Sequence, residues 1–424
     1  YNGTETEYTR ISGCYKTGKG GIFMLKGKTV VLAVSGSIAA YKIAYLASAL
    51  HKLHADVHVL MTENATNFIN PITFETLTGN KCLVDTFDRN FQFQVEHVSI
   101  AKKADVVMIA PASANVIGKL ANGLADDMLT TTVMACRCQK ILSPAMNTAM
   151  YENPVVQDNI RKLKNYGYEV ITPASGYLAC GDTGAGKMPE PETLLEYILK
   201  EAAFQKDLAG KKLLVTAGPT QEAIDPVRCL TNHSVRKEGY AIAKMAMLRG
   251  AEVTLVSGPT AIEPPLFVKV VPVTSARDMF EAVTGLSDEQ DIIIKAAAVA
   301  DYRPKQVSED KVKKKDDQAS IELERTDDIL KYLGQHKKQG QFLCGFSMET
   351  RDMLRNSRAK LEKKKPGYGG SQQPEGRSAG FQGDTNVLTL ITQDEEVSLP
   401  LMSKEDAALK ILDKILLLTT KAEA

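Results

Sequence analysis

Cys180 stands among four glycines in the stretch GYLACGDTGAGKMPEP, residues 176–191. A cysteine can be a buried apolar residue, a metal ligand, or a reactive thiol that exchanges a proton. The glycines allow the backbone a mobile loop around this thiol. The chain has seven cysteines, an odd number, and no C-x-x-C pair, which argues against both a disulfide framework and a zinc site. A buried Cys180 and a reactive Cys180 remain the alternatives.

Two further polar residues lie beside apolar runs and have side chains suited to catalysis. Asn147, in PAMNTAMYENP, follows a strand-like run, and Met146 and Met150 are available to line an apolar wall. The Asn147 amide can hydrogen-bond a substrate carboxylate while it stays uncharged, or it can cap the next helix. His97, in VEHVSIAKKADVV, carries the usual acid/base group near neutral pH. A histidine that only packs against its apolar neighbours is the alternative.

Small polar loops end two other apolar runs in the first half. The turn at Ser35–Ser37, in AVSGSIAAYK, precedes a helical pattern, and the free N–H groups of a helix start suit a phosphate. A turn rich in Gly and Ser for its geometry alone is the alternative. Ser113 and Asn115 follow a neighbouring run, and we expect Asp126 and Asp127 inside a helix. Two such loops on adjacent strands favour a flat polar ligand such as a flavin.

The second half has its own candidate site. An apolar run opens the segment LLVTAGPTQEAIDPVRCLTN and is followed by a Gly-Pro-Thr turn. Another apolar run opens the segment IIIKAAAVADYRP and is followed by small residues and Asp301. The segment KVKKK, residues 311–315, is a local basic run. Such a run is either a solvated loop or, beside a phosphate-binding turn, a site that neutralises a nucleoside triphosphate.

Alternating apolar runs and amphipathic stretches must position these residues. From Lys28 the pattern reads strand, tight turn, helix, strand, which predicts a βαβ unit and a parallel sheet. The pattern restarts after Leu208 with a second set of apolar runs. We therefore expect two doubly wound, Rossmann-like α/β domains, whose polar loops lie at the carboxyl ends of the strands, where open parallel sheets bind ligands.

Length and composition agree with this organisation. A chain of 424 residues exceeds the ~250–300 residues of a single core. Its 52 Lys and Arg nearly balance 51 Asp and Glu, so charge favours neither a nucleic acid nor a membrane as partner. Apolar runs are too short for a membrane span, and we expect a soluble cytoplasmic protein. Residues 1–23 are expected to be a disordered translated leader, with domains at 24–207 and 208–424.

The first half resembles the flavin-dependent cysteine decarboxylases that act on 4'-phosphopantothenoylcysteine. The resemblance is carried, in this order along the chain, by His97 and the segments PASAN, PAMNTAMYENP and ACGDTGAGKMPEP. The resemblance covers residues 27–200 and implies a flavodoxin-like fold with FMN bound at the interfaces of a homotrimer, possibly within a dodecamer. It implies that His97 is catalytic, that Asn147 holds the departing carboxylate, and that Cys180 protonates or helps to reduce the enethiol product. The implied FMN-binding residues are Gly36, Ser37, Ile38, Ala39, Thr62, Ser113 and Asn115, and the implied substrate-binding residues are Met146, Ala179, Gly181 and Asp182.

Residues 210–418 resemble the phosphopantothenate–cysteine ligases. The resemblance is carried by the segments DPVRCLTNHS, AAAVADYRP and GFSMET. The resemblance implies that CTP and Mg²⁺ activate 4'-phosphopantothenate as an acyl-cytidylate, from which cysteine displaces CMP. It implies that Asn232 stabilises this intermediate and that Arg228 contacts it. The nucleotide site implied by the resemblance comprises Ala296, Ala297, Asp301, Lys311, Phe346, Lys360 and Lys364, whereas no metal ligand is implied.

Two segments depart from the ligase pattern without a change in length. VRKEG replaces a Ser-Gly-Lys-Met-Gly turn after Ser234, and KPGYGGSQQPEGRSAG replaces a buried strand that ends in Ala-Asn. We expect that no sheet interior accepts the second segment. Paired frameshifts in the gene sequence explain both departures, and resequencing should restore the turn and an apolar strand before Gly380. If residues 235–238 and 366–379 are genuine, the ligase half should be crippled.

The sequence leaves three alternatives to the bifunctional enzyme. The first is a decarboxylase with an inactive ligase half. The second is an FMN-binding regulatory subunit without catalytic activity, which the presence of Cys180 and Asn147 disfavours. The third is flavin prenylation, which leaves the second half unexplained.

Overall fold

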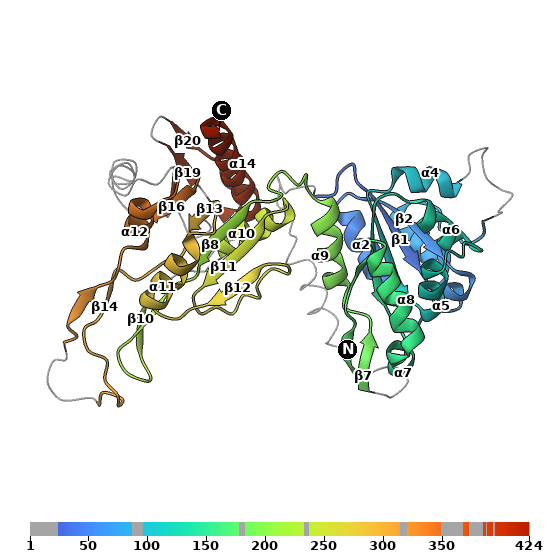
Figure 1. Ribbon diagram of the computed structural model, residues 1–424, viewed down its shortest axis with the longest axis horizontal. Helices are drawn as coiled ribbons and strands as arrows, with labels where there is room; N and C mark the ends of the chain where they lie inside the picture. Colours follow the sequence, from blue (N-terminus) through green and yellow to red (C-terminus); the bar gives the residue numbers. More distant parts are fainter. Residues whose placement is uncertain are drawn as a thin grey trace. The chain divides into compact units, whose positions relative to one another are not determined.

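The computed structural model describes most of the chain as two compact units. The described residues are 24–86, 96–177, 183–232, 237–313, 320–348, 368–372, 385–386, 388–392 and 395–423. The chain passes from the first unit to the second between Gln205 and Lys206 (Figure 1). Within the described residues, no helix combines the length and the apolar character that a membrane span requires.

The first unit is built on a five-stranded parallel sheet in the order β2-β1-β3-β4-β5. Its strands are β1 (Thr29–Val34), β2 (Asp56–Met61), β3 (Val106–Ala112), β4 (Gln139–Pro144) and β5 (Glu169–Val170). β1 and β3 are buried along their whole length, as expected of strands that are covered on both faces. This is the flavodoxin-like strand order, whose direction of winding reverses between β1 and β3.

Helices cover both faces of this sheet, and a hairpin lies beyond β5 in the chain (Figure 1). The elements are α2 (Ala40–Lys52), η1 (Glu63–Asn67), α3 (Pro71–Thr78), α4 (Glu96–Lys103), α5 (Ala114–Ala121), α6 (Met128–Ala135), α7 (Thr148–Glu152), α8 (Pro154–Asn165), α9 (Pro191–Ala202), and the hairpin strands β6 (Ala174–Tyr177) and β7 (Thr183–Lys187). α2 packs against α9 on one face, and α4, α5, α6 and α8 cover the other.

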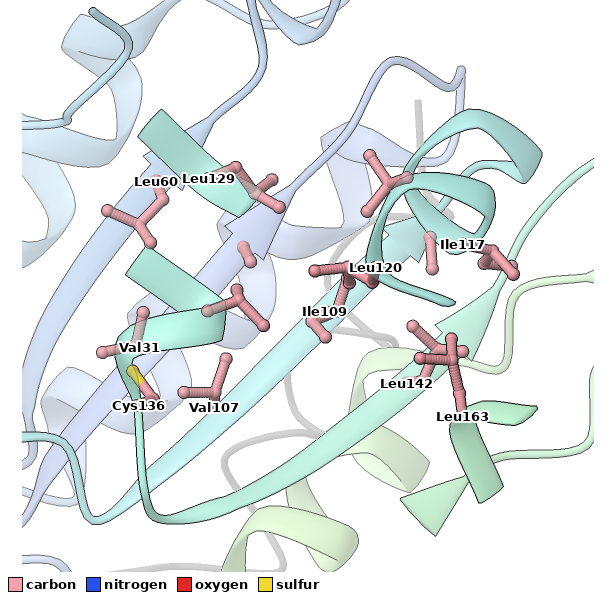
Figure 2. Close-up of a cluster of buried hydrophobic side chains, with 14 of the residues drawn as sticks. Val31, Leu60, Val107, Ile109, Ile117, Leu120, Leu129, Cys136, Leu142 and Leu163 are labelled. Atoms are coloured by element: carbon pink, nitrogen blue, oxygen red, sulfur yellow. The ribbon is translucent and has the colours of Figure 1, made fainter. Parts of the chain in front are cut away.

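Figure 2 shows the core under these four helices, where apolar side chains of the sheet meet those of the helices. The labelled residues are Val31, Leu60, Val107, Ile109, Ile117, Leu120, Leu129, Cys136, Leu142 and Leu163. Each fully buried aliphatic side chain of this kind contributes about 1.5–3 kcal/mol. The core therefore holds the carboxyl ends of the strands in fixed positions relative to one another.

The expectation that Asp126 and Asp127 lie inside a helix is wrong. Both precede α6, and Asp127 is its N-cap, because its Oδ1 accepts a hydrogen bond of 2.8 Å from the N–H of Thr130. Lys119 forms ion pairs of 2.7 and 2.9 Å with the two carboxylates. Aspartate favours this position over a helix interior, since its short side chain satisfies the free N–H groups of the first turn.

The second unit contains an eight-stranded sheet in the order β12-β11-β8-β13-β16-β17-β19-β20. Its strands are β8 (Lys212–Ala217), β11 (Glu252–Ser257), β12 (Lys269–Pro272), β13 (Ile292–Lys295), β16 (Phe342–Met348), β17 (Tyr368–Gln372), β19 (Leu388–Ile391) and β20 (Glu396–Ser398). The strands from β12 to β17 are parallel, and β19 and β20 add an antiparallel edge. Winding starts at β8 and reverses between β8 and β13, as in a Rossmann fold.

The helices of this unit again lie on both faces. α11 (Ala276–Ser287) and α12 (Ile329–His336) cover one face through a cluster of buried apolar residues. α10 (Lys237–Leu248) packs on β8 and β11 of the other face, beside α14 (Lys404–Glu423). The small two-stranded sheets are β9 (Gln221–Ala223) with β10 (Cys229–Thr231), β14 (Tyr302–Pro304) with β15 (Leu323–Arg325), and β18 (Thr385–Asn386) with β21 (Met402–Ser403).

The expectation that no sheet interior accepts the segment after Lys364 is wrong for residues 368–372. They form β17, which pairs in parallel with β16, Tyr368 opposite Cys344, and antiparallel with β19, Gln372 opposite Leu388. Ladder hydrogen bonds join backbone groups, so glycines weaken a strand without excluding it. Of the other departing segment, residues 235 and 236 lie outside the described residues, and Lys237 begins α10.

Candidate functional site

Ser35 joins two of the polar loops at the carboxyl edge of the first sheet. Its side chain is fully buried directly after β1, and its hydroxyl donates a hydrogen bond of 2.7 Å to the carbonyl oxygen of Pro111 in β3. The same hydroxyl accepts a hydrogen bond of 2.9 Å from the N–H of Ser113. The loop after β1 and the loop after β3 are therefore held side by side at the point where the winding of the sheet reverses.

The predicted FMN-binding residues gather at this point. Thr62 donates its N–H to the carbonyl of Val34 at 3.1 Å, which brings the end of β2 beside the end of β1. A Cβ on Gly36 would stand 2.9 Å from the Cβ of Asn64, so only glycine fits between these loops. Ser113 caps α5, and Asn115 is the second residue of that helix.

The start of α2 is suited to an anionic group. Its N-cap, Ala39, has no side chain that accepts from the first turn, and the first turn contains no acidic residue. Ser37 turns its hydroxyl to the N–H of Ala39 at 3.3 Å, and the side chain of Ile38 is exposed. The positive end of the helix dipole is therefore not neutralised by a side chain of α2, which fits the phosphate of a flavin nucleotide.

Asn147 lies at the same edge, after β4, where it is the N-cap of α7. Its Oδ1 accepts a hydrogen bond of 2.9 Å from the N–H of Ala149, so the helix-capping alternative is correct for this oxygen. The loop before it is tied to β3, because Ala145 donates its N–H to the carbonyl of Ala112 at 3.0 Å. Capping fixes the direction of the amide group at the start of α7.

The hairpin β6–β7 is attached to the Asn147 loop at its base. Met146 donates its N–H to the carbonyl of Gly186 in β7 at 3.1 Å. Gly186 has φ +126°, and a Cβ there would stand 2.3 Å from the carbonyl oxygen of Met146. Glycine is therefore required for this approach. The residues predicted between the two strands, Ala179, Cys180, Gly181 and Asp182, lie outside the described residues.

An ion pair connects the end of this hairpin to α2. Both carboxylate oxygens of Glu190 accept from the ammonium group of Lys42 at 2.8 Å. The Lys42 side chain is 12% exposed and the Glu190 side chain 56%, so solvent screens the pair from the Glu190 side. Lys187 adds a weaker contact of 3.7 Å to Glu190.

His97 is half-buried in the first turn of α4. α4 packs against α6 and leads into the amino-terminal end of β3. The place of His97 in the decarboxylase site therefore stays a prediction.

The second candidate site lies at the corresponding edge of the second sheet. Ala298 donates its N–H to the carbonyl of Gly218 at 2.9 Å, and Ala297 donates to the hydroxyl of Thr216 at 3.1 Å. The Nδ2 of Asn232 donates to the carbonyl oxygens of Ala298 and Val299 at 3.1 and 3.3 Å. Asn232 is therefore in direct contact with Ala298 and Val299, which follow Ala296 and Ala297 in the loop after β13.

Other predicted residues of this site are positioned around it. Phe346 follows Gly345, whose partner in the sheet register is Lys295, directly before Ala296. Asp301 follows the Ala298–Val299 contact by two residues, and its carbonyl accepts from the N–H of Thr326 at 3.1 Å. Lys360 and Lys364 lie outside the described residues.

Arg228 and the segment that contains Lys311 are also in contact. The Nη2 of Arg228 donates to the carbonyl of Val312 at 2.9 Å, and Asp225 hydrogen-bonds both partners. The Arg228 guanidinium holds the pKa of the Asp225 carboxyl well below its usual range. Among the described residues, no group of three or more His, Cys, Asp and Glu side chains is placed to hold a metal ion.

Sequence reasoning missed Ser35 as a link between loops, Asp225, and the pair of Lys42 with Glu190. Ser35 had a signal, since it begins the polar turn, but its partners lie 76 and 78 residues away. Asp225 stands in the motif DPVR, where its spacing from Arg228 is the available signal. Lys42 and Glu190 are separated by 148 residues, and no sequence pattern indicated that they pair.

Comparison with known proteins covers both units. Residues 23–203 match the family Flavoprotein, and residues 208–418 match the family DNA/pantothenate metabolism flavoprotein C-terminal domain. The coenzyme A biosynthesis bifunctional protein CoaBC of Bacillus subtilis (strain 168) is 46% identical over 396 residues, which cover 92% of this chain and 97% of that protein. This chain belongs to the CoaBC family. It is therefore a member of a bifunctional family of coenzyme A biosynthesis.

Further relatives support the same family. The CoaBC protein of Vibrio vulnificus (strain YJ016) is 42% identical over 394 residues, covering 92% of this chain and 98% of that protein. A solved structure of the C-terminal domain of a CoaBC protein has 46% sequence identity and a TM-score of 0.44, and covers 50% of this chain and 98% of that chain. The first candidate site lies within the residues that match the Flavoprotein family, and the second lies within those that match the C-terminal domain family.

Proposed function

We propose that this chain catalyses two consecutive steps of coenzyme A biosynthesis, each at one of the two candidate sites. Residues 208–424 ligate cysteine to 4'-phosphopantothenate with CTP, and residues 24–207 decarboxylate the resulting 4'-phosphopantothenoylcysteine to 4'-phosphopantetheine with FMN. One observation carries this proposal: the CoaBC relationship spans both units, and in each unit the predicted residues are joined at the reversal point of a parallel sheet. Such points are where open α/β sheets bind nucleotides.

The first site fits FMN. The backbone N–H groups at the start of α2 would donate hydrogen bonds to the phosphate, and the loops of Gly36, Thr62 and Ser113 would hold the rest of the molecule. Their close packing, with Gly36 against Asn64 and Ser35 between two strands, excludes bulky side chains from this region. When bound here, FMN would supply a reversible two-electron oxidation of the carbon that carries the substrate thiol.

The chain's own residues bind and orient the substrate. Asn147, fixed by its cap to α7, directs its amide nitrogen to the carboxylate that leaves as CO₂. An uncharged amide holds this group without stabilising it as strongly as a cation does. Met146 lines the apolar side, which favours the loss of charge. Cys180 donates the proton that completes the enethiol reduction, and His97 supplies an acid/base group.

The second site binds three anionic reactants or intermediates. Asn232 and Arg228 hold the acyl-cytidylate, and Asp301, Lys311 and Phe346 contribute to the nucleotide site. Mg²⁺ would enter with the CTP phosphates and would screen their negative charge. The carboxylate of 4'-phosphopantothenate attacks the α-phosphorus of CTP, and pyrophosphate leaves. Cysteine then attacks the activated carbonyl, CMP leaves, and an amide bond remains.

The proposed assembly is a homotrimer of the decarboxylase half, alone or as part of a dodecamer, with FMN at the subunit interfaces. Exposed apolar side chains on and near α2, among them Ile38, Tyr41 and Tyr45, are compatible with such burial between subunits. Sedimentation of the full chain measures the assembly directly, and a monomer that decarboxylates would exclude it.

The test uses the purified full chain. Its absorption spectrum is recorded for bound flavin, and CO₂ is measured from 4'-phosphopantothenoylcysteine. In a separate reaction, CMP release is measured from CTP, 4'-phosphopantothenate and cysteine. Both activities are expected. CO₂ without CMP would establish a decarboxylase with an inactive ligase half, and bound FMN with neither product would establish a regulatory flavoprotein instead.

A further inference from the structure

Asp225 is the centre of a hydrogen-bonded joint between two distant segments of the second unit. Its Oδ1 accepts from the N–H groups of Val227 and Arg228, both at 2.9 Å. Its Oδ2 accepts from the Nε of Arg228 and the N–H of Val312, both at 3.1 Å, and from the Nη2 of Arg228. Five N–H donors thus converge on one carboxylate.

The two residues of the central ion pair have very different exposure. The side chain of Asp225 has no exposed surface, whereas half of the Arg228 side chain is exposed. The guanidinium is therefore anchored at its inner side and open at its outer side. Because both Nε and Nη2 bind the same carboxylate, the plane of the guanidinium is fixed as well as its position.

The same joint fixes the backbone beside Lys311. Both polar backbone groups of Val312 are hydrogen-bonded, since its N–H donates to Asp225 and its carbonyl accepts from Arg228 at 2.9 Å. A second contact lies a few residues earlier, where Ser308 donates its N–H to the carbonyl of Ile224 at 3.0 Å. The segment 308–312 is therefore attached to the turn 224–228 at two points.

We propose that Asp225 is a positioning residue of the ligase half, which holds Arg228 and Lys311 in one arrangement to receive an anionic acyl or phosphoryl group. This proposal rests on the proposed function, in which Arg228 and Lys311 bind ligands. Asp225 itself is too buried to touch a substrate, and it acts through the arginine and through Val312. Its negative charge also compensates the Arg228 charge before the substrate arrives.

Asp225→Asn tests this role with the smallest change of shape. The amide retains one oxygen for the N–H groups of Val227 and Arg228, but its NH₂ group faces donors and cannot accept from Arg228 or Val312. Losing such charge-assisted hydrogen bonds should raise the KM for 4'-phosphopantothenate about tenfold or more. The turnover of the decarboxylase half, measured on the same sample, should stay unchanged.

Arg228→Gln and the double variant distinguish positioning from a general structural role. Because Asp225 acts partly through Arg228, Asp225→Asn should raise the KM by a smaller factor in a chain that already carries Arg228→Gln than in the wild type. Asp310→Asn is the matched control, because it makes the same change of charge on an exposed residue two positions before Val312. It should leave the KM at the wild-type value.

Two further measurements make the result independent of turnover. Calorimetry of 4'-phosphopantothenate binding to the full chain should show weaker binding for Asp225→Asn than for Asp310→Asn. Hydrogen exchange should be faster at the Val312 amide, with the amides of β8 unchanged, and a general loss of protection would overturn the positioning role. Wild-type binding and KM in Asp225→Asn, or effects that multiply fully in the double variant, would also overturn it. A wild-type chain that binds 4'-phosphopantothenate but releases no CMP would refute the proposed ligation alone.

Discussion

Gly186→Ala should inactivate the decarboxylase half by separating the β6–β7 hairpin from the Asn147 loop. In the native structure a Cβ at Gly186 would lie 2.3 Å from the carbonyl oxygen of Met146. An ordinary contact between nonbonded heavy atoms is about 3.5 Å, so the two segments must separate by about 1 Å. A displacement of this size in an active site costs about 10²-fold in rate.

The stability cost follows from the same geometry. Holding alanine at φ +126° costs about 1–3 kcal/mol, and the lost hydrogen bond from Met146 costs about 0.5–1.5 kcal/mol more. A domain is typically stable by about 5–15 kcal/mol, so the first unit should remain folded. CO₂ release should therefore fall about 10²-fold while CMP release by the second unit stays unchanged.

Gly123→Ala is the matched control for backbone strain without steric overlap. Gly123 also has a positive φ, +73°, but nothing lies within 4 Å of an added Cβ. This variant should lose some thermal stability and keep its decarboxylase activity. Wild-type CO₂ release in Gly186→Ala, or an equal loss in both variants, would refute the steric reasoning.

Four further predictions concern residues of both sites. Ser35→Ala should weaken FMN binding about tenfold, because it removes the link between β1 and β3, and flavin fluorescence titration measures this. Asn147→Asp should block CO₂ release by placing a like charge beside the substrate carboxylate, and retention of full activity would contradict the assignment. Cys180→Ser should let an oxidised, decarboxylated product accumulate, detectable by mass spectrometry, because a hydroxyl of higher pKa is a poorer proton donor. Arg228 lowers the pKa of Asp225 in the folded chain. The wild type should therefore be more stable than Asp225→Asn by the full amount at neutral pH, and this difference should decrease as the pH falls below about 4. Chemical denaturation at several pH values measures the difference.

The sequence predicted the fold well because buried parallel strands leave a strong local signal. β1, β3 and β8 are continuous apolar runs, and the prediction of two doubly wound domains is confirmed by both strand orders. Strand ends are also local, so the loops of Ser113 and Asn147 could be placed correctly. The error at Asp127 arose because an N-cap and a first-turn residue differ by only one position.

The interactions that hold each site together were not predictable in the same way. Ser35 meets Pro111 across 76 residues, and Asp225 meets Val312 across 87. Such pairings depend on the three-dimensional path of the backbone, which neither periodicity nor composition contains. β17 was misjudged for a related reason, since its backbone pairs with its neighbours although its sequence does not resemble an interior strand.

Gly239, at the third position of α10, limits which residue the gene can encode at this position. A Cβ there would lie 2.7 Å from the Cβ of Ala217 and 2.9 Å from the carbonyl oxygen of Thr216, so the helix rests on β8 only if this codon specifies glycine. A gene sequence that restores a different turn after Ser234 must therefore still encode glycine at position 239.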